Sequence, residues 1–230
     1  MSLTTYRRKR NFGITPEPSG RNKRSDRQRG KLIYVIQKHR ASHLHYDFRL
    51  ELNGVLLSWA VPKGPALDPS VKRLATRVED HPVDYAFFEG VIPEGEYGGG
   101  TVMLWDQGTW VPESEDPDAA LKKGELKFTL HGKKLKGSWV LVRTRGFGKK
   151  PDSSSWLLIK HRDRYASTND VAETKPYSVK SHRLLAEIAR DAGGDVRKAA
   201  TGDPPQRRVY PAKERTRPKA EGGWLKATVN

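Results

Sequence analysis

Residues 43–52 alternate strictly between polar and apolar side chains. This period of two predicts a β-strand with one apolar face. The polar face carries His43, His45, Asp47, Arg49 and Glu51. A solvated strand face usually carries Lys, Thr, Ser and Glu, whereas imidazoles, carboxylates and guanidinium groups hold divalent metals and phosphate or carboxylate anions. We therefore interpret this strand as the floor of an active site.

His39 offers a third metal-binding side chain close to this strand. It lies six residues before His45 and follows a predicted strand over 32–37. A short connection would bring it beside His45 and Asp47. Two imidazoles and one carboxylate leave positions open for water and substrate, and they suit Mn²⁺, Fe²⁺, Co²⁺ or Zn²⁺ better than Mg²⁺. The alternative is three solvated side chains on an edge strand, which would not explain Arg49 in the same row.

A second stretch with polar alternation covers residues 77–81. One of its faces carries Arg77, Glu79 and His81. If this strand lines the same groove, His81 and the nearby Tyr85 would join Arg49 around an anion. A lone histidine before a proline is also common as a capping or surface residue, so both interpretations stay open.

The basic charge of the chain is concentrated at its ends. The net charge is +16, and residues 1–31 carry ten lysines and arginines against two acids, while residues 193–230 carry nine against four. Basic arms on a nearly balanced domain indicate a polyanionic partner such as nucleic acid, although a solubilising tail has a similar composition. The chain contains no cysteine, which excludes disulfides, Cys-ligated zinc, iron–sulfur clusters and thiol catalysis.

Three segments are expected along the chain. They are a flexible basic N-terminal arm over 1–31, a β domain over 32–192, and a disordered basic tail or linker over 193–230. No apolar stretch approaches the roughly 18 residues that span a bilayer, and the basic N-terminus is not followed by the apolar part of a signal peptide. We expect a cytoplasmic, nucleoid-associated protein with no membrane partner.

Short predicted strands separated by turns dominate the middle of the chain. They cover 32–37, 43–52, 55–61, 73–79, 83–89, 101–105, 108–112, 125–131, 137–144 and 155–161. Asn53-Gly54 between two of them is a strong hairpin signal. This spacing, with one convincing helix over 181–191, predicts a mainly β fold with an antiparallel barrel or sandwich.

Five blocks of sequence resemble the 3′-phosphoesterase domain of bacterial and archaeal DNA ligase D. They are residues 34–39, 44–51, 58–65, 79–85 and 90–98. The match extends from about Arg7 to Ala189, and several blocks in the same order are more specific than a single motif. The ligase and polymerase domains of the full enzyme have no counterpart here, so the chain resembles a stand-alone or excised phosphoesterase.

The resemblance implies a closed or partly open β-barrel with a crescent groove that binds a primer–template 3′ end. Such domains remove a 3′-phosphate and resect a 3′-terminal ribonucleoside, leaving a 3′-hydroxyl for end joining. The implied partners are DNA with such ends and end-joining proteins such as Ku, a ligase and a polymerase. The implied cofactor is Mn²⁺, with Co²⁺ or another divalent transition metal as substitutes.

Site residues are carried over from the family position by position. His39, His45 and Asp47 match the metal ligands; Arg49, His81 and Tyr85 match the phosphate contacts; Gln37, Lys63, Arg73 and Glu79 match supporting positions. His81 could either stabilise charge on the phosphoryl group or protonate the leaving oxygen. Asn11 replaces the family's usual aspartate in the N-terminal arm, while Glu17 is retained, which puts ribonucleoside removal in more doubt than phosphate removal.

Two other functions compete with this interpretation. A non-haem Fe(II) oxygenase could use His45, Asp47 and His131 as its facial triad and Arg143 as an anchor, but His39 would then have no purpose. A non-catalytic DNA-end-binding module could grip a terminal phosphate with the same polar row and need no metal. Metal dependence separates the second alternative from an enzyme.

Overall fold

The computed structural model describes residues 2–20, 30–144 and 154–207. The strands are β1 (Ile33–Arg40), β2 (Leu44–Leu52), β3 (Val55–Val61), β4 (Lys72–Arg77), β5 (His81–Pro82), β6 (Gly90–Ile92), β7 (Gly100–Pro112), β8 (Glu125–Gly132), β9 (Lys136–Arg143) and β10 (Ser155–Lys160). The helices are α1 (Thr4–Arg8), α2 (Pro117–Lys123), α3 (Val171–Thr174), α4 (Leu185–Asp191) and α5 (Val196–Ala200), with 3-10 turns η2 (Val83–Phe87) and η3 (Pro205–Arg207).

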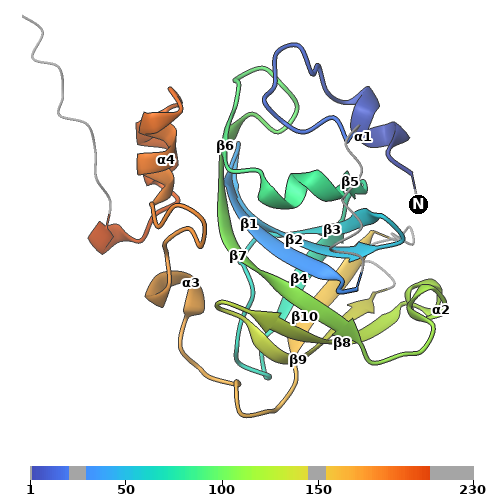
Figure 1. Ribbon diagram of the computed structural model, residues 1–230. Coiled ribbons are helices and arrows are strands. Elements are labelled where there is room, and N and C mark those ends of the chain that lie inside the picture. Colours follow the sequence, from blue (N-terminus) through green and yellow to red (C-terminus); the bar gives the residue numbers. More distant parts are fainter. Residues whose placement is uncertain (1, 21–29, 145–153, 208–230) are drawn as a thin grey trace, which may run out of the picture.

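Eight of these strands close into an antiparallel barrel (Figure 1). Their order is β1-β2-β3-β4-β10-β9-β8-β7, and β7 pairs back with β1. β5 lies outside this ring beside β3, and β6 lies beside β7. The Asn53-Gly54 hairpin joins β2 to β3 with both residues at positive φ, 52° and 77°. The predicted mainly β fold with an antiparallel barrel is confirmed.

The apolar faces of the strands fill the barrel. Tyr46, Phe48 and Leu50 of β2 are buried in the main core, as the alternation of residues 43–52 predicts. Four fully buried tryptophans occupy the same interior: Trp59, Trp105, Trp110 and Trp139. Because successive strand residues point to opposite sides, the polar row of β2 must lie on the outside of the barrel.

A second, smaller hydrophobic core lies on this outer side. It joins Tyr6 of α1, Val35 of β1, Tyr85 of η2, Ile92 of β6 and Val102 of β7. It therefore fixes the N-terminal segment, η2 and β6 against the barrel wall beside the polar row. In Figure 1 the dark blue N-terminal segment lies over this part of the barrel.

The structure corrects the expectation of a flexible arm for residues 2–20. Tyr6 is fully buried, and its hydroxyl donates a hydrogen bond to Pro18 O at 2.6 Å. Phe12 packs against the same small core. Two aromatic side chains thus give this polar segment enough apolar surface to pack. Residues 21–29 lie outside the described part of the chain.

Several predicted strands differ from the observed elements. Residues 83–89 contain η2, which buries Tyr85 and Ala86, because Pro82 fixes an extended start and the chain then turns with a period near three. The predicted strands 101–105 and 108–112 form one strand, β7, with a register shift opposite Ile36 and Gln37. The predicted strand 73–79 ends at Arg77.

The C-terminal region contains more helix than expected. The predicted helix 181–191 begins only at Leu185, where Glu187 Oε2 accepts a hydrogen bond from Leu184 N at 2.8 Å. Within the expected tail, α5 buries Ala199 and Ala200. Residues 208–230 lie outside the described part. None of the helices in the described residues has the length and apolarity needed to span a membrane.

Candidate active site

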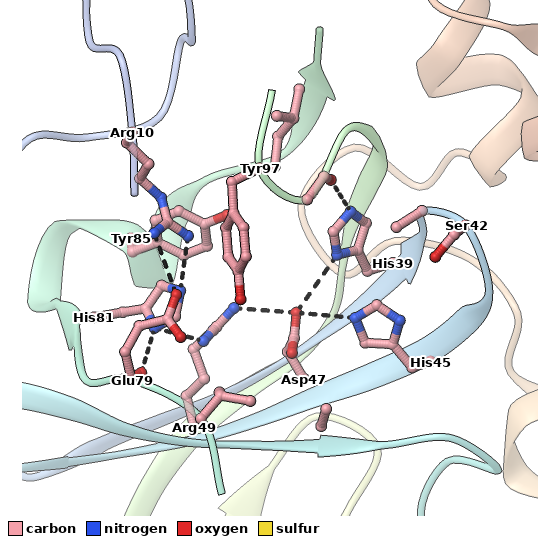
Figure 2. A pocket seen from close by; sticks show the side chains of 15 residues that line it. Arg10, His39, Ser42, His45, Asp47, Arg49, Glu79, His81, Tyr85 and Tyr97 are labelled. Carbon is pink, nitrogen blue, oxygen red and sulfur yellow. Dashed lines mark hydrogen bonds and ion pairs between the residues drawn. The ribbon is translucent and has the colours of Figure 1, made fainter. Parts of the chain in front are cut away.

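The register of β1 and β2 brings the predicted polar side chains together. His39 lies opposite His45, and Gln37 lies opposite Asp47. All four are on the outer wall of the barrel, as the alternation requires. Three of them, His39, His45 and Asp47, border an open pocket of about 300 Å³ (Figure 2) and share its wall with Arg49, His81 and Tyr85. Gln37, which was carried over from the family, does not line this pocket.

His39, His45 and Asp47 form a group that could hold a metal ion. Asp47 Oδ2 lies 3.7 Å from His39 Nδ1 and 3.7 Å from His45 Nε2. The three ligand atoms all lie within 4.8 Å of one another. Donors bound to one ion at about 2.1 Å are roughly 3 to 3.5 Å apart, so these side chains are close to the spacing that a shared metal imposes.

Hydrogen bonds orient the imidazoles of His39 and His45 for metal binding. His39 Nε2 lies 2.8 Å from Gly98 O, and His45 Nδ1 lies 3.1 Å from His43 O. A carbonyl oxygen only accepts, so each of these nitrogens carries the proton. The opposite nitrogen of each ring, His39 Nδ1 and His45 Nε2, then offers a lone pair toward Asp47. Outer hydrogen bonds of this kind are usual for metal-binding histidines.

The charge states also suit metal binding. Burial lowers the pKa of His45, although Asp47 partly offsets the shift, so its ring is neutral near pH 7. Burial alone would raise the pKa of the Asp47 carboxyl, but Arg49 and the two imidazoles hold that pKa well below its ordinary value. A neutral imidazole and an ionised carboxylate are the forms that bind metals.

Arg49 lies between the His39, His45 and Asp47 group and His81. Its Nε donates to Gln37 Oε1 at 2.8 Å, and its Nη2 lies 3.1 Å from Asp47 Oδ2. Gln37 is held in turn by donating to the carbonyl oxygens of Tyr85 and Phe88. The Arg49 side chain is buried, so these contacts fix its position. A guanidinium has five N–H groups, which leaves some of them for an anion.

His81 lies between two arginines. Its Nδ1 is 2.9 Å from Glu79 O and 3.0 Å from Arg49 Nη1, and its Nε2 is 3.2 Å from Arg10 Nη2. The Glu79 carbonyl takes the Nδ1 hydrogen, so Nε2 accepts from Arg10. Burial, together with Arg49 and Arg10, holds the pKa of His81 well below 6.5. The ring is therefore neutral in this structure.

The N-terminal segment completes the pocket with Arg10, which the sequence patterns did not indicate. Its Nε donates to Glu17 Oε1 at 2.8 Å, and its Nη1 donates to Glu79 Oε1 at 3.3 Å. Tyr85 donates its hydroxyl to the same Glu17 oxygen at 2.9 Å. Tyr85 thus lies in the pocket wall with its hydroxyl bonded to Glu17 and its ring centre 4.9 Å from the Arg49 guanidinium carbon.

Comparison with known proteins identifies the family. The model of the DNA ligase D 3′-phosphoesterase domain matches residues 37–143. A multifunctional non-homologous end joining protein LigD of Pseudomonas aeruginosa is 53 % identical over 207 residues, which cover 87 % of this chain and 24 % of that protein. The chain belongs to the family of DNA ligase D 3′-phosphoesterase domains. The resemblance seen in the sequence is confirmed.

In other relatives, too, the match covers only a part of a longer protein. The LigD of Mycobacterium tuberculosis is 48 % identical over 146 residues, covering 63 % of this chain and 18 % of that protein. The LigD of Mycolicibacterium smegmatis is 42 % identical over 169 residues, covering 70 % and 21 %. The chain thus spans between about a fifth and a quarter of the length of these curated relatives.

Not every residue carried over from the phosphoesterase family lies in the pocket. Lys63 is exposed on the turn after β3, and Arg73 lies on β4; neither lines the pocket. Arg77 is also outside it, because its guanidinium lies 4.7 Å from the Trp59 ring and pairs with Asp80. Glu79 and His81 do line the pocket. The predicted strand 77–81 therefore contributes two of its three polar side chains.

Three residues behind the doubt about ribonucleoside removal and behind the oxygenase alternative lie outside the pocket, namely Asn11, His131 and Arg143. Asn11 is exposed, outside the residues that line the pocket, and its Oδ1 accepts from Gly13 N at 3.1 Å. His131 lies on β8 and borders a different cavity, while Arg143 donates to Lys122 O. The structure therefore does not bring together the facial triad of an Fe(II) oxygenase.

Proposed function

We propose that this chain is a Mn²⁺-dependent phosphoesterase that removes 3′-phosphates from DNA ends. We also propose that it resects a 3′-terminal ribonucleoside to leave a 3′-phosphate, which the first activity then removes to give a 3′-hydroxyl for end joining. One observation carries the proposal. A trio that could hold a metal shares one pocket with two arginines, and Arg49 meets the trio at Asp47, whose Oδ2 lies 3.7 Å from each imidazole nitrogen and 3.1 Å from Arg49 Nη2.

The donor set fits Mn²⁺ and related ions. His39, His45 and Asp47 would hold the ion and leave positions open for water and a phosphate oxygen. A divalent ion bound there supplies Lewis acidity and lowers the pKa of a bound water. The names of the LigD relatives refer to non-homologous end joining, which supports DNA ends as the substrate. Ku, a ligase and a polymerase stay predicted partners.

Arg49 and Arg10 would bind the phosphoryl oxygens. Both guanidinium groups line the pocket and are held by buried partners, Gln37 for Arg49 and Glu17 for Arg10. Donors fixed in this way stabilise the negative charge of the transition state without reorganising during the reaction. Water attacks phosphorus, the bond from phosphorus to the 3′-oxygen breaks, and this oxygen leaves as the hydroxyl.

We assign His81 to orienting Arg10 rather than to proton donation. Its Nδ1 hydrogen is committed to Glu79 O, its Nε2 accepts from Arg10, and its low pKa keeps the ring neutral. A neutral ring has no second proton to give at Nε2. The leaving 3′-oxygen then takes its proton from water.

The function is tested with 5′-labelled primer–templates that end in a 3′-phosphate or in one ribonucleotide. Each is incubated with the purified protein in Mn²⁺ or in EDTA, and the primer ends are resolved on a gel. We expect Mn²⁺-dependent conversion of both substrates to a 3′-hydroxyl. Conversion of the phosphate substrate alone would refute the ribonucleoside step.

Tight binding without conversion of either substrate would contradict the enzyme and favour a non-catalytic DNA-end-binding module. Such a module should keep its affinity in EDTA. Binding and turnover are therefore measured on the same samples, so that a loss of activity is not confused with a loss of affinity.

A further inference from the structure

Tyr97 is an exposed aromatic side chain at the edge of the pocket. It lies on the loop between β6 and β7, and 48 % of its surface is exposed, whereas Tyr85 in the same pocket is 2 % exposed. In Figure 2 its ring is drawn between Tyr85 and His39. Tyr97 belongs to neither hydrophobic core of the described residues, so packing of the fold does not account for it.

Hydrogen bonds nevertheless hold the loop of Tyr97 in a defined place. The next residue, Gly98, offers its carbonyl to His39 Nε2 at 2.8 Å. Gly99 N donates to Glu96 O at 2.9 Å, and Gly98 adopts a φ of 81° that favours glycine. The residue after Tyr97 is therefore hydrogen-bonded directly to His39, one of the three candidate metal ligands.

The side chain of Tyr97 is also oriented. Lys9 Nζ donates to the Tyr97 hydroxyl at 3.0 Å and lies 4.4 Å from the ring centre. Lys9 in turn pairs with Glu79 Oε2 at 3.1 Å. The Arg10 guanidinium carbon also lies 5.5 Å from the ring centre. A flat ring that two cations hold in place and that is still 48 % exposed is suited to stack on another flat ring. Its basic surroundings, Lys9 and Arg10, favour a ligand that carries phosphates.

We propose that Tyr97 is the stacking platform for the base of the 3′-terminal nucleoside. This inference rests on the proposed function, because a 3′-phosphate bound by Arg49 and Arg10 brings its own nucleoside to the edge of the pocket. Every base has a π face, so stacking holds the end without reading its sequence. The subsite therefore binds a nucleobase and prefers the larger purines.

A matched pair of substrates isolates the contact. Both are primer–templates with a 3′-phosphate, and they differ only in whether the terminal nucleoside carries adenine or is abasic. We expect Tyr97→Ala to raise KM for the adenine end roughly tenfold, in line with the loss of one stacked base, with a smaller change in kcat. For the abasic end, Tyr97→Ala and the unaltered protein should have the same KM.

Two further variants separate stacking from a structural role. Tyr97→Phe keeps the ring and loses the hydroxyl, so it should restore most of the affinity for the adenine end. Tyr165→Ala removes another tyrosine, 36 % exposed and outside the pocket, and should leave both KM values unchanged. An equal rise in KM on adenine and abasic ends with Tyr97→Ala would overturn the inference, because the contact would not involve the base.

A binding measurement keeps this inference separate from the proposed function. DNA with 2-aminopurine as the terminal base and a 3′-hydroxyl cannot turn over, and stacking on tyrosine quenches its fluorescence. Quenching by the protein and by Tyr97→Phe, but not by Tyr97→Ala, supports the platform even if no phosphate is released from any substrate. Equal quenching by Tyr97→Ala would refute the platform even if the enzyme is active.

Discussion

At the scale of single residues, the candidate site depends on which ring nitrogen of each histidine keeps a lone pair for a metal. The Gly98 and His43 carbonyls take one hydrogen from His39 and His45, and this leaves His39 Nδ1 and His45 Nε2 facing Asp47. The alternation of residues 43–52 predicted that His45 and Asp47 share one face of a strand. It could not predict the tautomers, because these depend on the Gly98 carbonyl, 59 positions away from His39.

Loss of one imidazole should abolish metal binding. We expect His45→Ala to weaken Mn²⁺ affinity by at least roughly 100-fold, since even changes to outer hydrogen-bond partners of a metal site cost about 10- to 100-fold. Titration followed by the electron paramagnetic resonance of free Mn²⁺ measures this affinity. The matched control is His43→Ala, which removes an exposed imidazole directly before β2 and keeps the carbonyl that holds His45. Equal affinity of the two variants would contradict the assigned ligands.

His81 should stay neutral across the pH range in which a free imidazole titrates. Burial and the two arginines lower its folded pKa, so the unfolded chain takes up this proton first as pH falls. The stability that the neutral ring contributes is present above pH 6.5 and is lost progressively below it. Long-range ¹⁵N–¹H spectra of the protein should show the Nδ1–H tautomer at pH 7 and at pH 6. A ring that is protonated at pH 6 would restore proton donation as its role.

At the scale of elements, local patterns predicted the strands but not what packs on them. β1 to β3 follow from period two and from one Asn-Gly turn. Helix α2 had its signals in the sequence, with Asp116 as N-cap, Pro117 next and Gly124 at the end, but it buries no residue and so shows no apolar stripe. The N-terminal segment was missed because its contacts are long-range: Arg10 meets Glu79 across 69 positions.

Detaching the N-terminal segment should impair the site and leave the barrel folded. Tyr6→Ala removes a fully buried ring from the small core, a change that costs about 3 kcal/mol in typical cores. We expect faster tryptic cleavage within residues 2–20 and at least a tenfold lower kcat/KM, while circular dichroism of the barrel is retained. Ile14→Ala alters a 56 % exposed residue of the same segment and should change neither. Slow cleavage with Tyr6→Ala would show that other contacts hold the segment.

At the scale of the whole molecule, the barrel is a nearly neutral body with basic ends. The site lies on its outer wall, where the small core fixes η2 and the N-terminal segment beside β1 and β2. The net charge of +16 should attract the phosphate backbone of DNA to the protein. The sequence predicted the barrel. It did not predict that β7 pairs with β1 to close it, because this pairing contains a register shift and residues 101–105 and 108–112 were predicted as two separate strands.

DNA binding should depend steeply on salt, because neutralised phosphates release counterions. Residues 208–230 contain six lysines and arginines against two acids. We expect that a chain ending at residue 207 binds DNA with a slope of log affinity against log salt that is shallower by about two to four units. Fluorescence anisotropy between 50 and 200 mM salt (roughly the range in which such slopes are resolved) measures it. An unchanged slope would mean that these residues do not contact the DNA backbone.

The central claim is that the outer polar faces of β1 and β2 form a metal-dependent phosphoesterase site. The most direct test is single-turnover release of phosphate from a DNA end with a 3′-phosphate, after removal of bound metal and titration with Mn²⁺. The account predicts that the unaltered protein and His43→Ala release phosphate in proportion to bound Mn²⁺, and that His45→Ala and Asp47→Asn release none. Equal release in EDTA, or full activity of His45→Ala, would contradict it.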